Sequence, residues 1–381
     1  MSTFPLRKPR LLNHYYILCD PPDDKGDEVL HFISEKRRIK LKGYAFREFQ
    51  RLVVPLLDGR HTVGEIVEEV QDVFAADDLE AALQLLADQE LLEEGDGEIH
   101  LTGDLAAIRP QLNLFHALGA APREAQTRLE KATVSILGAG GAGATASLLL
   151  AACRVGTLRI LDASSVAPAD TYLAPEFSLE DVGFLRAEAL SRKIRSVSPE
   201  VNCIVQVQAL ESDDDVLTAI GASDFVLGSV DAGQSSLLYK LNRVCRKNGI
   251  PWIATTTSAI EVVVGPAVAP QDKACYLCYK MRVVACSENP EDEFAFQSFL
   301  DRRKRDDSAQ RENNVFGTVL AGNLAALEII KAISRISPVV THGQVVIFDL
   351  LNLSTTKHQV LRKPWCPVCY PNAATSEGNK I

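Results

Sequence analysis

The stretch TVSILGAGGAGATASLLLAAC, residues 133–153, decides the fold, because it combines a strand-like run, a glycine-rich turn and an apolar helical run in direct succession. Further β-rich runs follow it, separated by helical stretches: TLRILD, NCIVQVQAL, DFVLGSV, PWIATTT and QVVIFDL. Strands that alternate with helices are typical of an α/β domain whose largely parallel sheet is covered on both faces. We therefore predict a doubly wound sheet for this part of the chain.

The turn carries Gly138, Gly140, Gly141 and Gly143, which is the glycine pattern of a Rossmann-type nucleotide-binding turn. Glycine is needed where the turn is tight and where backbone N–H groups approach phosphates at a helix N-terminus. Asp162 ends the next strand, about 20 residues further on, where a carboxylate can accept hydrogen bonds from ribose hydroxyls. The same glycines would also suit a turn that serves packing alone, and this alternative stays open at the level of the sequence.

Four of the cysteines form two CxxC pairs, Cys275 with Cys278 and Cys366 with Cys369. Together the pairs supply four thiolates, which close a tetrahedral shell and predict a structural Zn²⁺ site. A thioredoxin-like redox motif needs one CxxC at a helix start, and we expect neither pair in that setting. The other cysteines lie mostly in apolar surroundings and are interpreted as buried thiols, although Cys286, beside a charged segment, stays a candidate nucleophile.

Residues 1–95 contain two strand-like runs, three helical segments and a short final strand, which predicts a small winged-helix-like α+β domain. Thr62 and Glu65 have the spacing of a capping box at the start of the second helix. Such a domain leaves a strand edge and a helix groove exposed, where an extended peptide can pair through its backbone. We predict that Leu83, Leu86 and Leu91 on and after the third helix contact the peptide.

Four parts follow along the chain: the winged-helix-like domain, a helical connector, a nucleotide-binding domain with zinc knuckles, and a flexible tail. Their predicted bounds are 1–95, 96–130, 131–375 and 376–381. Residues 287–313 are highly charged, so we expect a solvated crossover or mobile loop rather than a core element.

Charge and hydropathy exclude two classes of partner. The formal net charge is −10 and the basic residues are dispersed, which gives no concentrated positive surface for nucleic acid. The start MSTFPLRKPR has no apolar run of signal-peptide length, and no stretch approaches the roughly 18 uninterrupted apolar residues of a membrane helix. We therefore expect a cytoplasmic protein that binds neither nucleic acid nor a membrane.

The glycine turn, the aspartate after the second strand, the SxD at Ser229–Asp231 and the paired cysteines together resemble the ubiquitin-activating-enzyme-like (ThiF/MoeB-type) family over about residues 105–371. The resemblance implies ATP on the glycine turn, ribose on Asp162, Mg²⁺ on Asp231 and adenylation of a carboxylate. It assigns Arg186, at a later helix start, the position of a catalytic lysine. It also implies a homodimer, to which the apolar segment 317–333 would contribute.

The sequence departs from that family at three positions. Where the family has Asn-x-x-Arg after the second strand, this chain has Asp170 to Leu173, so the arginine is missing. Arg186 replaces a lysine, and the two side chains differ in donor geometry. Gln111 stands where a cationic finger is expected. Because nucleotidyl transfer depends on cations that neutralise developing charge, these changes predict a weakened or rebuilt reaction.

The front segment, with LVVPLLDGRHTVGEIVEEV, resembles the precursor-peptide recognition element of proteins that modify ribosomal peptides. Two hypotheses follow. In the first, the protein binds the leader of a ribosomal precursor peptide and presents the core to a YcaO-type cyclodehydratase. In the second, it is an ATP- and Mg²⁺-dependent enzyme that adenylates a carboxylate of the precursor. A DNA-binding winged helix is disfavoured by the acidic residues of this segment.

Overall fold

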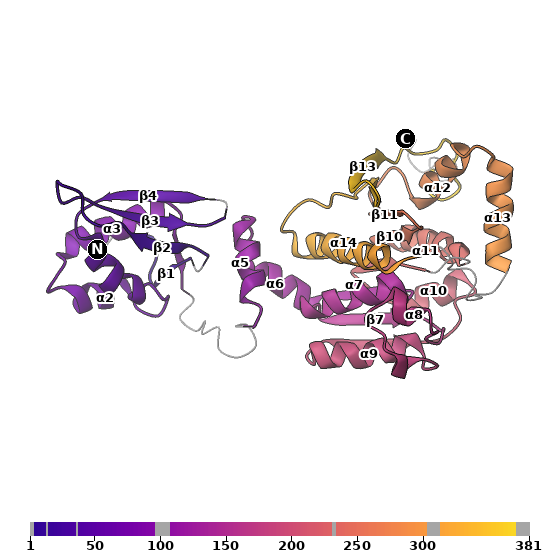
Figure 1. The fold of residues 1–381 in the computed structure, drawn as a ribbon, viewed down its shortest axis with the longest axis horizontal. Helices are drawn as coiled ribbons and strands as arrows, with labels where there is room; N and C mark the ends of the chain where they lie inside the picture. Colours follow the sequence, from indigo (N-terminus) through magenta and orange to yellow (C-terminus); the bar gives the residue numbers. More distant parts are fainter. Residues whose placement is uncertain are drawn as a thin grey trace, which may run out of the picture. The chain divides into compact units, whose positions relative to one another are not determined.

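The computed structural model describes residues 4–12, 14–35, 37–95, 107–230, 234–302 and 313–370. The chain divides into two compact units, Met1–Gly119 (the front unit) and Ala120–Ile381 (the rear unit). The division falls within the segment predicted as a connector. Figure 1 labels the helices and strands of both units.

The front unit has a three-stranded antiparallel sheet in the order β2-β3-β4 and a separate pair, β1 with β5. Helices α1, α2 and α3 enclose a core with the inner face of the sheet, and Leu30, Phe32 and Ile66 in that core are fully buried. The predicted capping box is confirmed, because Thr62 and Glu65 bond each other's backbone at the start of α2. The bounds are β1 (Pro9–Leu11), β2 (Tyr16–Cys19), β3 (Glu28–Ile33), β4 (Arg38–Gly43), α1 (Phe46–Leu52), α2 (Val63–Val70), α3 (Ala76–Asp88), β5 (Leu92–Glu94) and α5 (Arg109–Ala117).

The rear unit contains an eight-stranded sheet in the order β13-β12-β11-β10-β9-β6-β7-β8. Strands β8, β7, β6, β9 and β10 are parallel, and β11, β12 and β13 extend the sheet in antiparallel fashion. The predicted doubly wound sheet is confirmed. The strands are β6 (Thr133–Leu137), β7 (Thr157–Leu161), β8 (Asn202–Gln206), β9 (Phe225–Gly228), β10 (Trp252–Thr257), β11 (Glu261–Val268), β12 (Gln344–Asp349) and β13 (Ser354–Gln359).

Helices form two groups around this sheet (Figure 1). Helices α6, α7, α9 and α14 contact one another in one group, and α10, α11, α12 and α13 form the other. One predicted loop is wrong in part: residues 290–302 of the charged segment form α13, although residues 303–312 lie outside the described part. The bounds are α6 (Pro122–Lys131), α7 (Gly141–Ala152), α8 (Asp170–Leu173), α9 (Arg186–Val197), α10 (Asp213–Ile220), α11 (Ser235–Asn248), α12 (Tyr276–Ala285), α13 (Pro290–Arg302) and α14 (Val315–Ser334).

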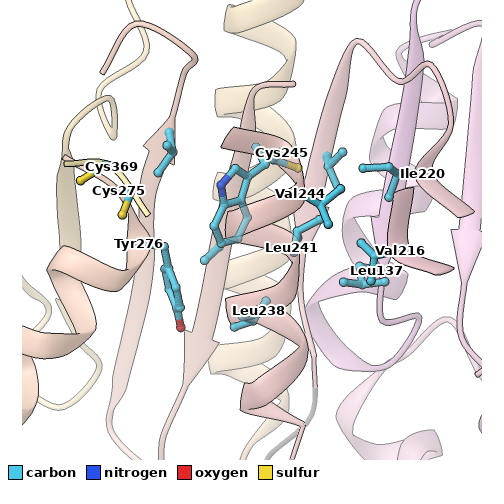
Figure 2. Close-up of a cluster of buried hydrophobic side chains, with 14 of the residues drawn as sticks. Leu137, Val216, Ile220, Leu238, Leu241, Val244, Cys245, Cys275, Tyr276 and Cys369 are labelled. Atoms are coloured by element: carbon cyan, nitrogen blue, oxygen red, sulfur yellow. The ribbon is translucent and has the colours of Figure 1, made fainter. Parts of the chain in front are cut away.

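The core between the sheet and α10, α11 and α12 is built from large apolar side chains. Figure 2 shows Leu238, Leu241 and Val244 of α11 within it, and Cys275 and Cys369 at one edge. The metal-site candidates therefore belong to the packed interior rather than to a surface loop.

Helix α14 is long and apolar enough to cross a membrane by length and composition alone. Its contacts with α7, β10 and β11 identify it as a core helix of the rear unit. Its one acidic residue, Glu328, is buried and accepts hydrogen bonds from the backbone and hydroxyl of Thr341 at 2.7 and 2.8 Å. Half of the most apolar stretch of α14 is buried within this chain. Its apolar character alone therefore does not identify the helix as a dimer surface.

The junction of β6 and α7 depends on glycine because backbone approaches backbone there. A Cβ on Gly143 would lie 1.9 Å from the carbonyl oxygen of Gly138, a distance that real Cβ atoms do not reach. The carbonyl belongs to the backbone and cannot move as a flexible side chain would.

Gly143→Ala should therefore lower the free energy of unfolding by about 1–3 kcal/mol, as overpacking of a tight core does. Gly64→Ala is the matched control, because a Cβ there meets nothing within 4 Å and the residue lies in helix α2. Denaturant unfolding of both variants measures the difference. Equal stability of the two would contradict the packing role of Gly143.

Candidate functional site

The glycine turn lies at the carboxyl ends of two neighbouring parallel strands, β6 and β9. Gly138 has φ +97°, and a Cβ there would lie 2.0 Å from the carbonyl oxygen of Ser229, just beyond β9. Gly140 is the N-cap of α7, and no side chain among the described residues caps this helix. The carboxyl ends of parallel strands and an uncapped helix N-terminus are where doubly wound sheets bind phosphorylated ligands.

Asp162 follows β7 and is fixed by the turn itself. Its Oδ2 accepts a hydrogen bond from the N–H of Ala139 at 2.9 Å, and its Oδ1 accepts one from the N–H of Ser164 at 2.8 Å. The structure thus brings Asp162 to the glycine turn. The prediction that it binds a ribose stays a prediction.

Arg186, the first residue of α9, lies beside these groups and is almost fully buried. Its Nε donates to Oδ2 of Asp170 at 2.7 Å, and its Nη2 donates to the other carboxylate oxygen. Its Nη1 lies 3.7 Å from Oδ2 of Asp162. One guanidinium therefore faces two carboxylates in a site from which solvent is nearly excluded.

The other positions at which the sequence departs from the pattern described above lie on different elements. Leu173 is buried on α8, and its carbonyl accepts a hydrogen bond from the hydroxyl of Thr318 on α14 at 2.5 Å. Gln111 lies on α5 in the front unit. Asp231, the predicted Mg²⁺ ligand, lies outside the described residues. ATP with Mg²⁺ therefore fits this site only in part. The glycine turn suits an anion and Asp162 suits a nucleoside, but the guanidinium of Arg186 is already bound by the carboxylates of Asp170 and Asp162.

Sequence reasoning missed Asp170 as a site residue and also missed Glu176. Glu176 is largely buried near Thr145 of α7, and burial raises the pKa of its carboxyl group. Asp170 stands where the family's Asn-x-x-Arg motif begins but was noted only as a departure from it, and Glu176 belongs to none of the motifs described above. They are recognised as site residues only because the fold brings separate segments of the chain together.

A cavity of about 720 Å³ lies at the opposite, amino end of the parallel strands, between Lys131, Phe225, Val268 and Arg335. Its cations sit at the C-terminal ends of α6 and α14, where positive charge offsets the helix dipole. Because the glycine turn, Asp162 and Arg186 gather at the carboxyl ends, the cavity is not part of the candidate nucleotide site.

The four predicted metal ligands do come together. The Sγ atoms of Cys275, Cys278, Cys366 and Cys369 lie within 4.8 Å of one another, and all four residues are buried. Three of the separations are 4.0 Å (Cys275–Cys278), 3.8 Å (Cys275–Cys366) and 3.4 Å (Cys278–Cys369). Zinc–sulfur bonds of about 2.3 Å in a tetrahedron require sulfur atoms about 3.8 Å apart. The cluster has the size and donor set of a closed, structural metal site.

One expectation about the cysteines is wrong, because Cys275 is the N-cap of α12 and the first pair does lie at a helix start. The second pair nevertheless faces it across the cluster, which a redox CxxC does not require. Burial raises the pKa of Cys275 to about 11 and also raises the pKa of Cys369. For Cys278 the effect of burial is outweighed by hydrogen bonds, which lower the pKa of its thiol, whereas Cys275 and Cys369 hold their protons without a cation. A metal must therefore displace protons from these two to bind.

The leucines predicted to contact a peptide require a correction. Leu83, Leu86 and Leu91 are at most 1% exposed and belong to the core of the front unit. They share this core with Leu30 and Phe32 of β3 and present almost no surface to a peptide as placed here. Leu85 on the same helix is 42% exposed and is the apolar side chain available on its outer face.

Replacing Cys278 with Ser should release the metal and lower the melting temperature, because structural zinc contributes folding free energy. Elemental analysis should find one zinc per chain in the wild type, and acidification should release it as protons compete for the thiolates. Cys286→Ser, an exposed cysteine outside the cluster, is the control. Purified protein without zinc, whose melting is unchanged by chelator, would remove the claim.

Comparisons with known proteins agree with this geometry. Molybdopterin-synthase adenylyltransferase of Salmonella typhimurium is 24% identical over 250 residues, 65% of this chain and 90% of that protein. Escherichia coli MccB in complex with MccA-N7isoASN matches with a TM-score of 0.67 at 19% identity, over 95% of this chain and 99% of that chain. PaaA matches with a TM-score of 0.66 at 18% identity, over 92% and 99%. A model of the ThiF family matches residues 111–368, and the chain therefore belongs to the ThiF family.

Proposed function

We propose that this protein captures the leader of a ribosomal precursor peptide in its front unit and presents the core of that peptide to a YcaO-type cyclodehydratase in the cytoplasm. The observation that carries the proposal is that the guanidinium of Arg186 already interacts with the carboxylates of Asp170 and Asp162. In the same site, Leu173 stands where the family has an arginine. A site of this kind suits a scaffold better than a nucleotidyl transferase. The likeness to MccB over nearly its whole length supports a peptide as the ligand.

The edge of the front sheet at β4 is the surface we assign to the peptide. The opposite edge, β2, is partly covered, since Gln50 of α1 donates a hydrogen bond to the carbonyl of Ile17 at 3.2 Å. The hydrogen bond from the N–H of Ser34 to the carbonyl of Arg37 sets the alternation along β3 and β4. By that alternation, the N–H groups of Arg38 and Lys40 point to the open edge, where an extended peptide can pair.

Two features favour an acidic, partly apolar leader at this edge. The side chains of Arg38, Lys40 and Lys42 lie along one exposed face of β4. Lys42 forms ion pairs with Asp23 and Asp27, so Arg38 and Lys40 are the cations we assign to the leader. Arg37, just before β4, forms an ion pair at 3.4 Å with Glu90, just after α3, so the end of α3 lies beside the start of the strand. The exposed Leu85 on α3 then supplies an apolar contact in place of the buried leucines.

The second candidate function is adenylation of a carboxylate of the precursor. The glycine turn and the placement of Asp162 against it favour this function, and several relatives carry adenylyltransferase names. It would require ATP and Mg²⁺ at the rear unit. In both candidates the four-cysteine cluster holds zinc as a structural ion.

A homodimer belongs to the same proposal. Helix α14 leaves Phe316 and Leu327 75% and 42% exposed, and their separation of eleven positions, about three turns, places both on the same face of the helix. Multi-angle light scattering at micromolar concentration should give twice the chain mass of 41.6 kDa. Phe316→Asp should shift the mass toward the monomer. A monomeric wild type would contradict the dimer.

Lys40→Pro should weaken peptide binding about ten-fold, because proline removes an outward N–H from the edge strand that the peptide needs. Proline is tolerated at a sheet edge, so the fold should persist. The probe is a fluorescently labelled leader peptide, with its sequence taken from a short reading frame to be sought among the neighbouring genes, titrated against the full chain by anisotropy.

Lys40→Ala is the matched control, since it removes the same side chain and keeps the N–H. It should bind within about three-fold of the wild type, because an exposed charge contributes little. Equal binding by the proline and alanine variants would exclude strand pairing at β4. Absence of binding by the wild type would exclude leader capture itself.

A further inference from the structure

We propose that Asp170 determines the ligand specificity of the rear unit. Its carboxylate pairs with Arg186 and offsets the positive charge of the guanidinium beside the glycine turn. The site therefore accepts a nucleoside without favouring its triphosphate. The inference rests on the proposed scaffold function and deepens it at the same site. It names the class of ligand, a nucleoside or nucleotide bound through its sugar, and the residue that limits binding of the phosphates.

Arg186 and Asp170 form a bidentate ion pair, in which the guanidinium is engaged by the carboxylate. Arg186 and Asp170 are both 1% exposed, and the guanidinium donates to both oxygens of the carboxylate. Bidentate Arg–carboxylate pairs have the strongest geometry among charge-assisted hydrogen bonds. The guanidinium therefore keeps this partner when a weaker or more solvated anion approaches.

Asp170 is itself held in place. Its Oδ2 also accepts a hydrogen bond from the N–H of Ala167 at 2.8 Å, and the helix it begins, α8, is tied to α14 through the bond between Thr318 and the carbonyl of Leu173. Swinging the carboxylate away would break these contacts and leave a buried charge unpaired, which is strongly unfavourable. The pair does not open to admit a phosphate.

Charge at the turn follows from this arrangement. The Oδ2 of Asp162 accepts a hydrogen bond from the N–H of Ala139 and also lies near Nη1 of Arg186. The carboxylate therefore lies against the backbone of the glycine turn. Among the residues that the structure describes here, the two carboxylates outweigh the one guanidinium. A phosphate at the N-terminus of α7 would meet backbone N–H groups that attract it and two carboxylates that repel it, whereas a ribose hydroxyl meets an acceptor.

The test compares ligands and variants of the full-length protein by isothermal titration, with adenosine, AMP and ATP as probes in the absence and presence of Mg²⁺. For the wild type, ATP should bind no more tightly than adenosine. Asp170→Asn keeps a hydrogen-bond acceptor for Arg186 and removes the negative charge. It should raise the affinity for ATP about ten-fold and leave that for adenosine unchanged.

The matched control removes both charges. Asp170→Leu combined with Arg186→Met replaces the buried pair by apolar groups of similar size, a change that proteins often tolerate. This double variant should gain no affinity for ATP, because it has no cation to release. Asp272→Asn, which removes a carboxylate that pairs with His342 instead, should also leave ATP binding unchanged.

Several outcomes would overturn the inference. These are ATP binding at least ten-fold more tightly than adenosine to the wild type, no gain in ATP affinity for Asp170→Asn, or no binding of adenosine at all. If Asp170→Asn does not fold, the wild-type ligand series still decides. Anisotropy titration of the labelled leader on the same samples separates this result from the proposed function, since leader binding should persist whichever way the nucleotide series falls.

Discussion

The rear unit depends on the approach of backbone to backbone at the glycine turn. Gly138 touches the backbone beyond β9, and Gly143 touches the carbonyl of Gly138, so β6, α7 and β9 meet with no side chain between them. On its other side α7 packs closely on α14, where a Cβ on Gly322 would lie 2.4 Å from the carbonyl oxygen of Ala142. This packing positions the carboxyl ends of the strands together with the glycine turn and Asp162, which contacts it.

The packing leaves two chemical regions with different characters. At the turn, a guanidinium and two carboxylates satisfy one another, and the region is nearly closed to solvent. At the far edge of the core, four sulfur atoms of the described residues converge in a cluster that could hold a metal ion. Among the described residues, the charges of the first region are paired within the protein, whereas the second region offers four sulfur donors that could hold a metal. This contrast is what favours a structural role for the rear unit.

Local patterns predicted much of this molecule. The glycine turn, the two CxxC pairs and the capping box of Thr62 are short-range signals whose physical meaning is fixed by spacing. The pairing of Arg186 with Asp170 is not of that kind, because it depends on how α8 folds back onto the start of α9. Strands β11 and β13 were missed for a similar reason, since antiparallel additions at a sheet edge are decided by their neighbours. The buried leucines of α3 were misread because periodicity identifies an apolar face but does not say whether that face is core or groove.

The central claim is that the protein holds a precursor peptide without activating it. Pyrophosphate exchange measures activation directly: purified protein is incubated with ATP, Mg²⁺, labelled pyrophosphate and the full precursor peptide, at peptide concentrations where anisotropy shows the leader to be bound. The account predicts no exchange above the peptide-free background. Exchange that appears with the peptide, and disappears when Asp162 is replaced by Asn, would contradict it and identify the protein as an adenylating enzyme.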